Sequence, residues 1–169
     1  MNKQVSEVVP TRVIAIYPNR LGYGYVVMES PVELLHWNMV KSEPANNDEI
    51  MSQINQILKT YGPAKVVLEN PDSKISRKTP RIKALLNRID TCAKAQSMAT
   101  QHYSREEIRK VFTRFGGAKT KYEIAEVVAK NIPALEPMLY NKPKYPYYEK
   151  YAVALFDSAS LAITHFFKN

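Results

Sequence analysis

Cysteine is nearly absent from this chain of 169 residues: Cys92 is the only one, so no disulfide forms within the chain. The three histidines and the single cysteine are not spaced in the pairs that bind structural zinc. No apolar run approaches the roughly 20 residues that span a bilayer, and the first residues lack the apolar segment of a secretory signal. We therefore expect a cytoplasmic protein without a disulfide, structural zinc or a membrane partner.

Glycine is also scarce, with five residues against eleven prolines that punctuate the chain. Hydrophobic residues make up 45% of the chain and charged residues 24%, which are the proportions of a globular protein and argue against disorder. A chain of this length is long enough to bury a core within one domain. We predict a flexible lead-in at residues 1–10 and a single domain over residues 11–169.

Positive charge is in excess, with a formal net charge of +8 at pH 7. Lysine and arginine gain affinity for polyanions by releasing counterions from phosphates. Between Asp72 and Asp90 the chain carries several cations and no acid, so this stretch predicts phosphate contacts, with a solvated helix face as the alternative. The cations of the stretch are Lys74, Arg77, Lys78, Arg81, Lys83 and Arg88.

The first half of the chain predicts a mixed β-sheet. Residues 12–16, 22–29 and 32–40 are β-prone runs with short connections, which favours a three-stranded antiparallel meander. Helical spacing of apolar residues follows over 50–58, and Gly62-Pro63 ends that segment. Residues 64–68 then form a buried strand that ends at Glu69, and a strand-helix-strand order implies parallel pairing.

The second half predicts helices and one short strand. A helix is expected from about Thr79 to Ala99, a strand near 98–103, two helices capped by Ser104 and Thr120, and a last helix over 149–166. The irregular stretch 136–148 mixes prolines with tyrosines and the lysines Lys142 and Lys144. It either stacks bases and contacts phosphates or is a connector whose tyrosines pack on the core edge.

Three motifs occur in an order that resembles a known family. They are Ile14-Ala15-Ile16-Tyr17-Pro18-Asn19 with Gly22-Tyr23-Gly24, then Val67-Leu68-Glu69-Asn70, then Asp157-Ser158-Ala159-Ser160-Leu161-Ala162-Ile163-Thr164-His165. This pattern resembles the RuvC family of Holliday-junction-resolving endonucleases. In that family a first strand leads into D-P-G-x-x-x-x-G-Y-G, a middle strand ends in Glu, and the last helix carries D-A-x-D-A-L-A-x-A-x-x-H.

Two further stretches extend the resemblance from about Arg12 to His165. Tyr103-Ser104 with Ile108-Arg109-Lys110 is similar to the family's Y-x-x-x-x-V-K, and Phe115–Lys121 is similar to its G-x-A-x-K. The resemblance implies an α/β, RNase H-like fold with a mixed five-stranded sheet flanked by helices. It also implies two-fold dimers that match the symmetry of a four-way junction, with the helix from Thr79 as a plausible interface.

The resemblance places Glu69 and Asp157 at two of the family's four metal-binding acids. Such acids hold two Mg²⁺ or Mn²⁺ ions about 4 Å apart for phosphodiester hydrolysis. This chain departs from the pattern at Tyr17, a neutral phenol at pH 7 and a poor magnesium ligand, and at Ala154, which offers no oxygen. Asp72 and Glu29 are either substitute ligands or ordinary exposed carboxylates.

Lys119 and Lys121 resemble the family's basic residues beside the scissile phosphate. Their position just before a helix N-terminus also suits an anion, although surface lysines near a helix start are the plainer interpretation.

Three functions follow as hypotheses. The first is a RuvC-like module that binds nucleic acid, most simply branched or duplex DNA, after losing efficient hydrolysis and with no cofactor. The second is a divergent endonuclease that still uses Mg²⁺ or Mn²⁺ through Glu69, Asp157 and one unorthodox carboxylate. The third is a structural or protein-interaction subunit, which leaves the cationic stretch without a purpose.

Overall fold

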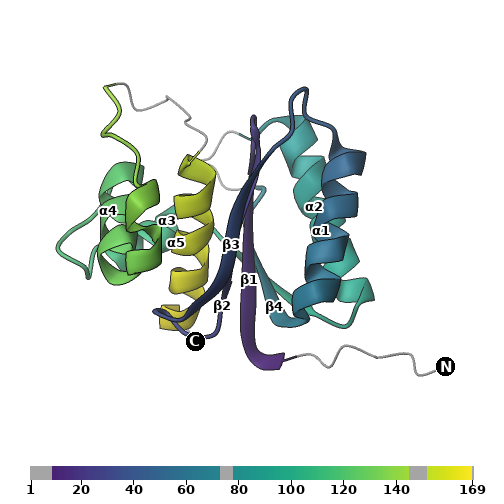
Figure 1. The fold of residues 1–169 in the computed structure, drawn as a ribbon, viewed down its shortest axis with the longest axis horizontal. Coiled ribbons are helices and arrows are strands. Elements are labelled where there is room, and N and C mark those ends of the chain that lie inside the picture. The colour runs from purple at the N-terminus through teal and green to yellow at the C-terminus, as the bar shows by residue number, and fades with distance from the viewer. Residues whose placement is uncertain (1–8, 73–77, 145–151, 169) are drawn as a thin grey trace.

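The computed structural model describes residues 9–72, 78–144 and 152–168 and contains one five-stranded sheet in the order β3-β2-β1-β4-β5 (Figure 1). β1, β2 and β3 are antiparallel neighbours, whereas β4 pairs in parallel with β1 and β5 in parallel with β4. The predicted meander with added parallel strands is therefore confirmed. The strands are β1 (Val9–Asn19), β2 (Gly22–Met28), β3 (Leu34–Lys41), β4 (Pro63–Glu69) and β5 (Ala99–Tyr103).

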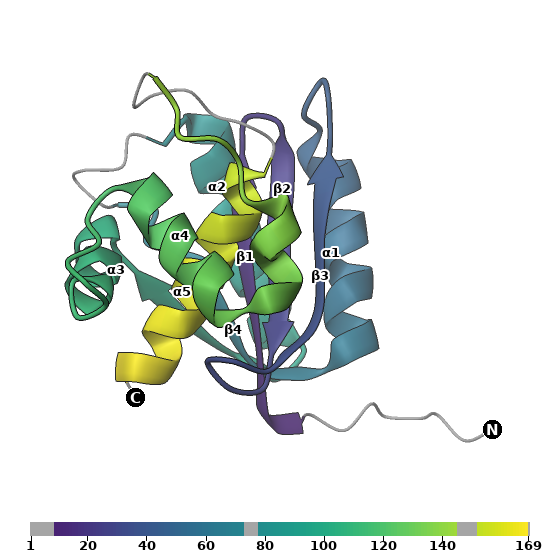
Figure 2. The same cartoon turned by 60° about the vertical axis from the view of Figure 1, so that its left-hand side comes forward.

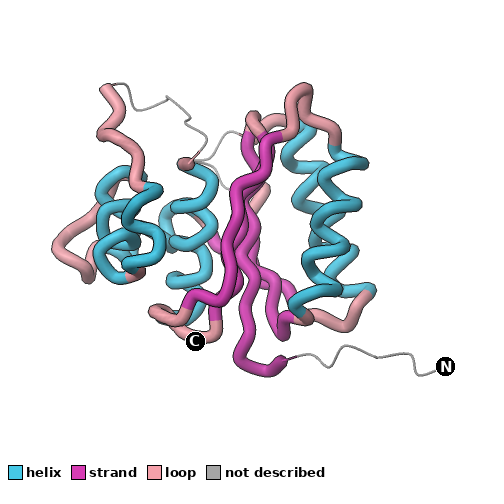
Figure 3. Tube along the Cα trace, in the orientation of Figure 1, coloured by secondary structure: helices cyan, strands magenta, loops and turns pink. Residues whose placement is uncertain are grey.

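Helices cover both faces of the sheet, as the tube view in Figure 3 shows. One face carries α1 (Asn47–Tyr61) and α2 (Pro80–Ala95), which begin at the side-chain caps Asn46 and Thr79. The other face carries α5 (Val153–Lys168), and outside it lie α3 (Arg105–Phe112), α4 (Lys121–Asn131) and the 3-10 helix η1 (Pro133–Met138). Figure 2 shows α4 and η1 in front of α5, with the sheet behind.

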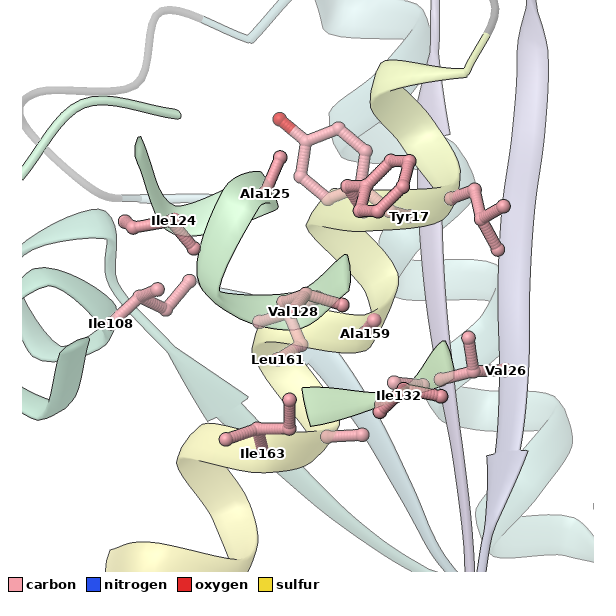
Figure 4. Close-up of a cluster of buried hydrophobic side chains, with 14 of the residues drawn as sticks. Tyr17, Val26, Ile108, Ile124, Ala125, Val128, Ile132, Ala159, Leu161 and Ile163 are labelled. Carbon is pink, nitrogen blue, oxygen red and sulfur yellow. The ribbon is translucent and has the colours of Figure 1, made fainter. Parts of the chain in front are cut away.

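The sheet separates two apolar cores because successive side chains of a strand point to opposite faces. Along β1, Ile14 and Ile16 pack toward α1 and α2, whereas Val13, Ala15 and Tyr17 pack toward α5. Figure 4 shows the second core, with the Tyr17 ring at its upper end and the hydroxyl oxygen directed away from the aliphatic side chains. Tyr17 thus belongs to the core through its ring and to a polar region through its hydroxyl.

α5 lies directly against β2, and Gly24 permits that approach. A Cβ atom on Gly24 would lie 2.6 Å from the backbone carbon of Ala154 and 2.7 Å from the backbone nitrogen of Leu155. Every residue of α5 from Val153 to His165 is buried, including Asp157. The contact with Gly24 therefore fixes the first turn of the helix and places Asp157 one turn further on.

Several boundaries differ from those predicted. Val9 and Pro10 belong to β1 and not to the lead-in, while residues 1–8 lie outside the described residues. α2 ends at Ala95 and not near Ala99, because Ser97 takes a positive φ of 62° before β5 begins. The predicted irregular stretch 136–148 begins inside η1, and Tyr145, Tyr147 and Tyr148 lie outside the described residues. None of the described helices has the length and apolar character needed to span a bilayer.

Candidate functional site

The carboxyl ends of β1 and β4 meet at one edge of the sheet. Ala15 is paired with Val67 in parallel register, so two residues further along Tyr17 comes beside Glu69. Both side chains are buried, with exposed fractions of 4% for Tyr17 and 1% for Glu69. Asp157 reaches the same place from α5, since Nζ of Lys121 contacts both the Tyr17 hydroxyl and Oδ2 of Asp157. The structure thus brings together the two carboxylates that the sequence singled out.

Asp157 is held by two cations. Nζ of Lys121 lies 3.1 Å from its Oδ2, and Nη2 of Arg105 lies 3.4 Å from its Oδ1. Lys121 also donates a hydrogen bond to the Tyr17 hydroxyl, at 3.3 Å. Both cations are the first residues of helices, because Thr120 caps α4 and Ser104 caps α3 through a capping box. The two capped helix starts therefore place both cations beside the Asp157 carboxylate.

Glu69 is held by a third cation. Nζ of Lys78 lies 2.9 Å from Oε2 of Glu69, and the exposed fractions of the two side chains are 6% and 1%. The same Nζ lies 4.8 Å from the centre of the Tyr17 ring, and Nζ of Lys121 lies 5.3 Å from it. The ring therefore lies near both ammonium groups, a favourable cation–π arrangement. The residues Tyr17, Glu69, Lys78, Arg105, Lys121 and Asp157 are called the ion-pair cluster below.

Burial and neighbouring charges determine which groups of the ion-pair cluster are protonated. Burial raises the pKa of Tyr17, and the Asp157 carboxylate raises it further, so the phenol is neutral at neutral pH. Burial opposes the charge on Lys121 and on Arg105, but the Asp157 carboxylate outweighs it, and both pKa values are raised above their ordinary values. Three cations against two carboxylates leave the cluster with one net positive charge.

These residues do not fit the two-metal site that the resemblance implies. Two hard divalent cations need several carboxylates to offset their charge. Both carboxylates are already paired with protein cations, and Ala154 is a buried alanine packed beside Gly24. Across the described parts of the chain, no three His, Cys, Asp or Glu side chains converge in a group suited to a metal ion.

The two substitute acids considered from the sequence do not complete a metal site. Glu29 pairs with Arg12 at 3.1 Å, and the register of Val13 with Met28 places it beside the start of β1. Five residues of extended strand, about 17 Å, separate that position from Tyr17. Asp72 is exposed in the turn after β4 and forms no such group with Glu69 and Asp157. Glu29 therefore lies away from Glu69 and Asp157, and a metal-ligand role for Glu29 or Asp72 stays a prediction.

The cations predicted to contact phosphates divide into two groups. Lys78 is buried against Glu69, and Arg81 bonds to Asn47 Oδ1 and to the Asn19 backbone carbonyl, both at 2.9 Å, so these two cations stabilise the fold. The residues of the second group are exposed and available to a ligand: Lys83, Lys119, Lys142 and Lys144. Arg88 is exposed but pairs with Asp48 at 2.8 Å, and Lys121 pairs with Asp157 while part of its side chain stays exposed. Lys74 and Arg77 lie outside the described residues.

Arg105 was not identified from the sequence as a member of this region. It is 4% exposed and bonds to Asp157. A signal was present, because a cation in the first turn of a helix is unfavourable unless a carboxylate lies near. Tyr140 packs edge-on against Phe156 with ring centres 5.8 Å apart, and burial followed by the Asp157 charge raises its pKa.

Solved structures with the same architecture can now be compared. A Thermus thermophilus RuvC structure has a TM-score of 0.66 at 20% identity and covers 92% of this chain and 93% of that chain. T. thermophilus RuvC in complex with a Holliday junction substrate has a TM-score of 0.65 at 18% identity and covers 93% of each chain. The yeast mitochondrial Holliday junction resolvase Ydc2 has a TM-score of 0.56 at 13% identity, covering 95% of this chain and 80% of that chain.

The sheet order and the flanking helices define an α/β protein of the RNase H-like class. Within that class, the structural matches show that the chain has the RuvC fold. No protein-family model matches the chain, and no curated protein matches its sequence. Since function belongs to a site and not to a fold, the activity has to be argued from the ion-pair cluster and its surroundings.

Proposed function

We propose that this chain binds nucleic acid, with branched DNA as the favoured ligand, and does not hydrolyse it. The observation that carries the proposal is the ion-pair cluster, in which Lys78, Lys121 and Arg105 neutralise Glu69 and Asp157. The net positive charge of this cluster, with the exposed lysines beside it, favours a phosphate backbone and disfavours divalent ions. The RuvC fold and the reported complex of one structural relative with a Holliday junction support branched DNA as the ligand.

The accessible cations near the cluster support phosphate contacts. Lys121 keeps 37% of its side chain exposed while it pairs with Asp157, and Lys119 is exposed two residues before it. Both lie at the N-terminus of α4, where unpaired backbone N–H groups favour an anion. The segment 139–144, whose sequence includes Tyr140, Lys142 and Lys144, follows η1 at the same end of the molecule (Figure 1).

The absence of hydrolysis follows from the charges. Metal-dependent hydrolysis requires bound ions that lower the pKa of a water molecule and stabilise the leaving oxygen. A lysine ammonium or a guanidinium cannot bind and ionise water in that way. One observation favours the alternative of an active endonuclease: Oε1 of Glu69 is buried and has no hydrogen-bond partner among the described residues. That alternative requires Lys78 to leave Glu69 before an ion can bind.

The homodimer expected from the resemblance stays a proposal. α2 packs Leu85, Leu86 and Ile89 against the sheet, and its outward positions include Lys83, Asn87 and Thr91. An interface through this helix would therefore be polar, and sedimentation of the protein with and without a four-way junction would test it.

Binding is tested by fluorescence anisotropy with a labelled four-way junction and a matched linear duplex. We expect tighter binding to the junction, equal affinity in EDTA and in Mg²⁺, and a steep loss of affinity with salt. The double variant K119A/K142A should weaken binding and lower the salt slope by about 2. The control K59A removes an exposed lysine from α1, on the opposite face of the sheet. An affinity for the junction that does not change with salt concentration, or that requires Mg²⁺, would contradict the proposal.

A further inference from the structure

Lys78 is an unusually buried lysine. It lies two residues before the first residue of α2, and its exposed fraction of 6% is far below that of a surface lysine. Its ammonium contacts Oε2 of Glu69 and faces the ring of Tyr17. Removing an ammonium from water is strongly unfavourable unless a carboxylate compensates for it. The Glu69 carboxylate therefore stabilises the buried ammonium of Lys78 at this position.

Glu69 is an incompletely satisfied partner. An ionised carboxylate offers about four lone-pair sites. The only ion pair of Glu69 among the described residues is the one to Lys78, and neither of its buried oxygens has a hydrogen bond with good geometry. Buried ion pairs that stabilise a fold are normally completed by further hydrogen bonds. The Glu69 carboxylate therefore keeps lone-pair sites that no described residue occupies with a hydrogen bond.

We infer that the Lys78 ammonium occupies the place of a divalent cation beside Glu69. It is a positive charge that is covalently tethered, so it cannot dissociate, and it excludes a metal ion from the carboxylate through charge and volume. This inference goes beyond the proposed function and does not depend on nucleic-acid binding. It predicts that loss of Lys78 creates a metal site where the wild-type protein has none.

The test restores a carboxylate at the neighbouring position and compares variants with and without Lys78. In Y17D the new acid joins Glu69 and Asp157 while Lys78 remains, and in Y17D/K78M the ammonium is replaced by an uncharged chain of similar length. Y17D/K83M is the control, since it loses an exposed lysine from the first turn of α2. Mn²⁺ binding is measured by titration calorimetry without nucleic acid, so failure here is distinct from failure of the proposed function.

We expect Y17D/K78M to bind one Mn²⁺ per chain at least about tenfold more tightly than Y17D or Y17D/K83M, because the like charge of Lys78 is gone. Equal affinity of Y17D and Y17D/K78M would overturn the inference. Mn²⁺ binding to the wild-type protein that is lost in E69Q would also overturn it.

A second comparison leaves the core residue Tyr17 unchanged. K78M leaves the buried Glu69 carboxylate without the Lys78 ammonium, whereas K78M/E69Q removes both charges of the pair. We expect a marked loss of Tm in K78M, partial recovery of that Tm in Mn²⁺, and a Tm for K78M/E69Q closer to wild type and indifferent to Mn²⁺. A K78M protein that Mn²⁺ does not stabilise, or a K78M/E69Q protein as unstable as K78M, would contradict the inference.

Discussion

Nζ of Lys121 lies 3.1 Å from Oδ2 of Asp157, joining the first residue of α4 to the second turn of α5. The two residues are 36 positions apart in sequence. The contact orients a cation on an acid that the sequence suggested as a metal ligand. Several properties of the protein follow from this pair and from the packing around it.

Replacing Lys121 by methionine should destabilise the fold. Among the described residues, Arg105 is then the one cation still paired with the buried Asp157. Breaking a fully buried pair costs about 3–5 kcal/mol, and the partial exposure of Lys121 reduces the expected loss to about 1–2 kcal/mol. Urea unfolding measures the change. K119M, at an exposed position two residues away, should leave the free energy of unfolding within about 0.5 kcal/mol of wild type.

The close approach of β2 to α5 predicts that G24A is more harmful than a glycine change in a turn. The added methyl group would collide with the backbone of Ala154 at 2.6 Å, and because backbone cannot move aside like a flexible side chain, we expect the upper end of the about 1–3 kcal/mol that overpacking costs. In G117A the added atom meets nothing within 4 Å, and the penalty comes from the positive φ of 79° alone. That penalty is about 1–2 kcal/mol. Thermal unfolding should rank G24A below G117A, and the reverse order would argue against the tight packing of α5 on β2.

Stability should fall in mild acid because of His165. Burial lowers the pKa of this histidine below its ordinary value of 6.5, and the charge of Lys65 lowers it further. The unfolded chain therefore takes up the proton at a higher pH than the folded chain does. The contribution of neutral His165 to the free energy of unfolding is complete above the pKa of this histidine in the unfolded chain. It is lost as the pH falls through the lower pKa of His165 in the folded protein.

Urea unfolding at several pH values below neutral checks this. H165N keeps a polar atom for the Tyr103 hydroxyl, which lies 2.9 Å from Nδ1 of His165, and should show a weaker dependence on pH. If the stability of H165N depends on pH as strongly as that of the wild-type protein, His165 is not the cause of the loss in mild acid.

Much of the fold could be predicted from local signals. The cap Asn46 with the Gly62 terminus bounds α1, and the capping box at Ser104 bounds α3, because caps act within a few residues. The end of α2 was misplaced because its apolar spacing continues through Met98, and the positive φ of Ser97 leaves no strong signature in a residue other than glycine.

The site was only partly predictable for a different reason. Glu69 and Asp157 were identified because they lie within motifs of fixed spacing. Lys78 was expected to face phosphates, yet it is buried against Glu69, and a cationic stretch does not reveal which of its members turns inward. Arg105 contacts Asp157 from 52 positions away, a pairing that depends on how α3 packs beside α5.

The central proposal is that Lys78, Lys121 and Arg105 neutralise Glu69 and Asp157 in place of metal ions, so that nucleic acid is bound and left intact. The most direct test incubates excess protein with a labelled four-way junction in Mn²⁺, and measures bound and cut junction in the same samples. The account predicts a shifted complex that forms equally in EDTA, with no product above the level seen for E69Q/D157N. Cut junction that requires Mn²⁺ and disappears in E69Q/D157N would contradict it.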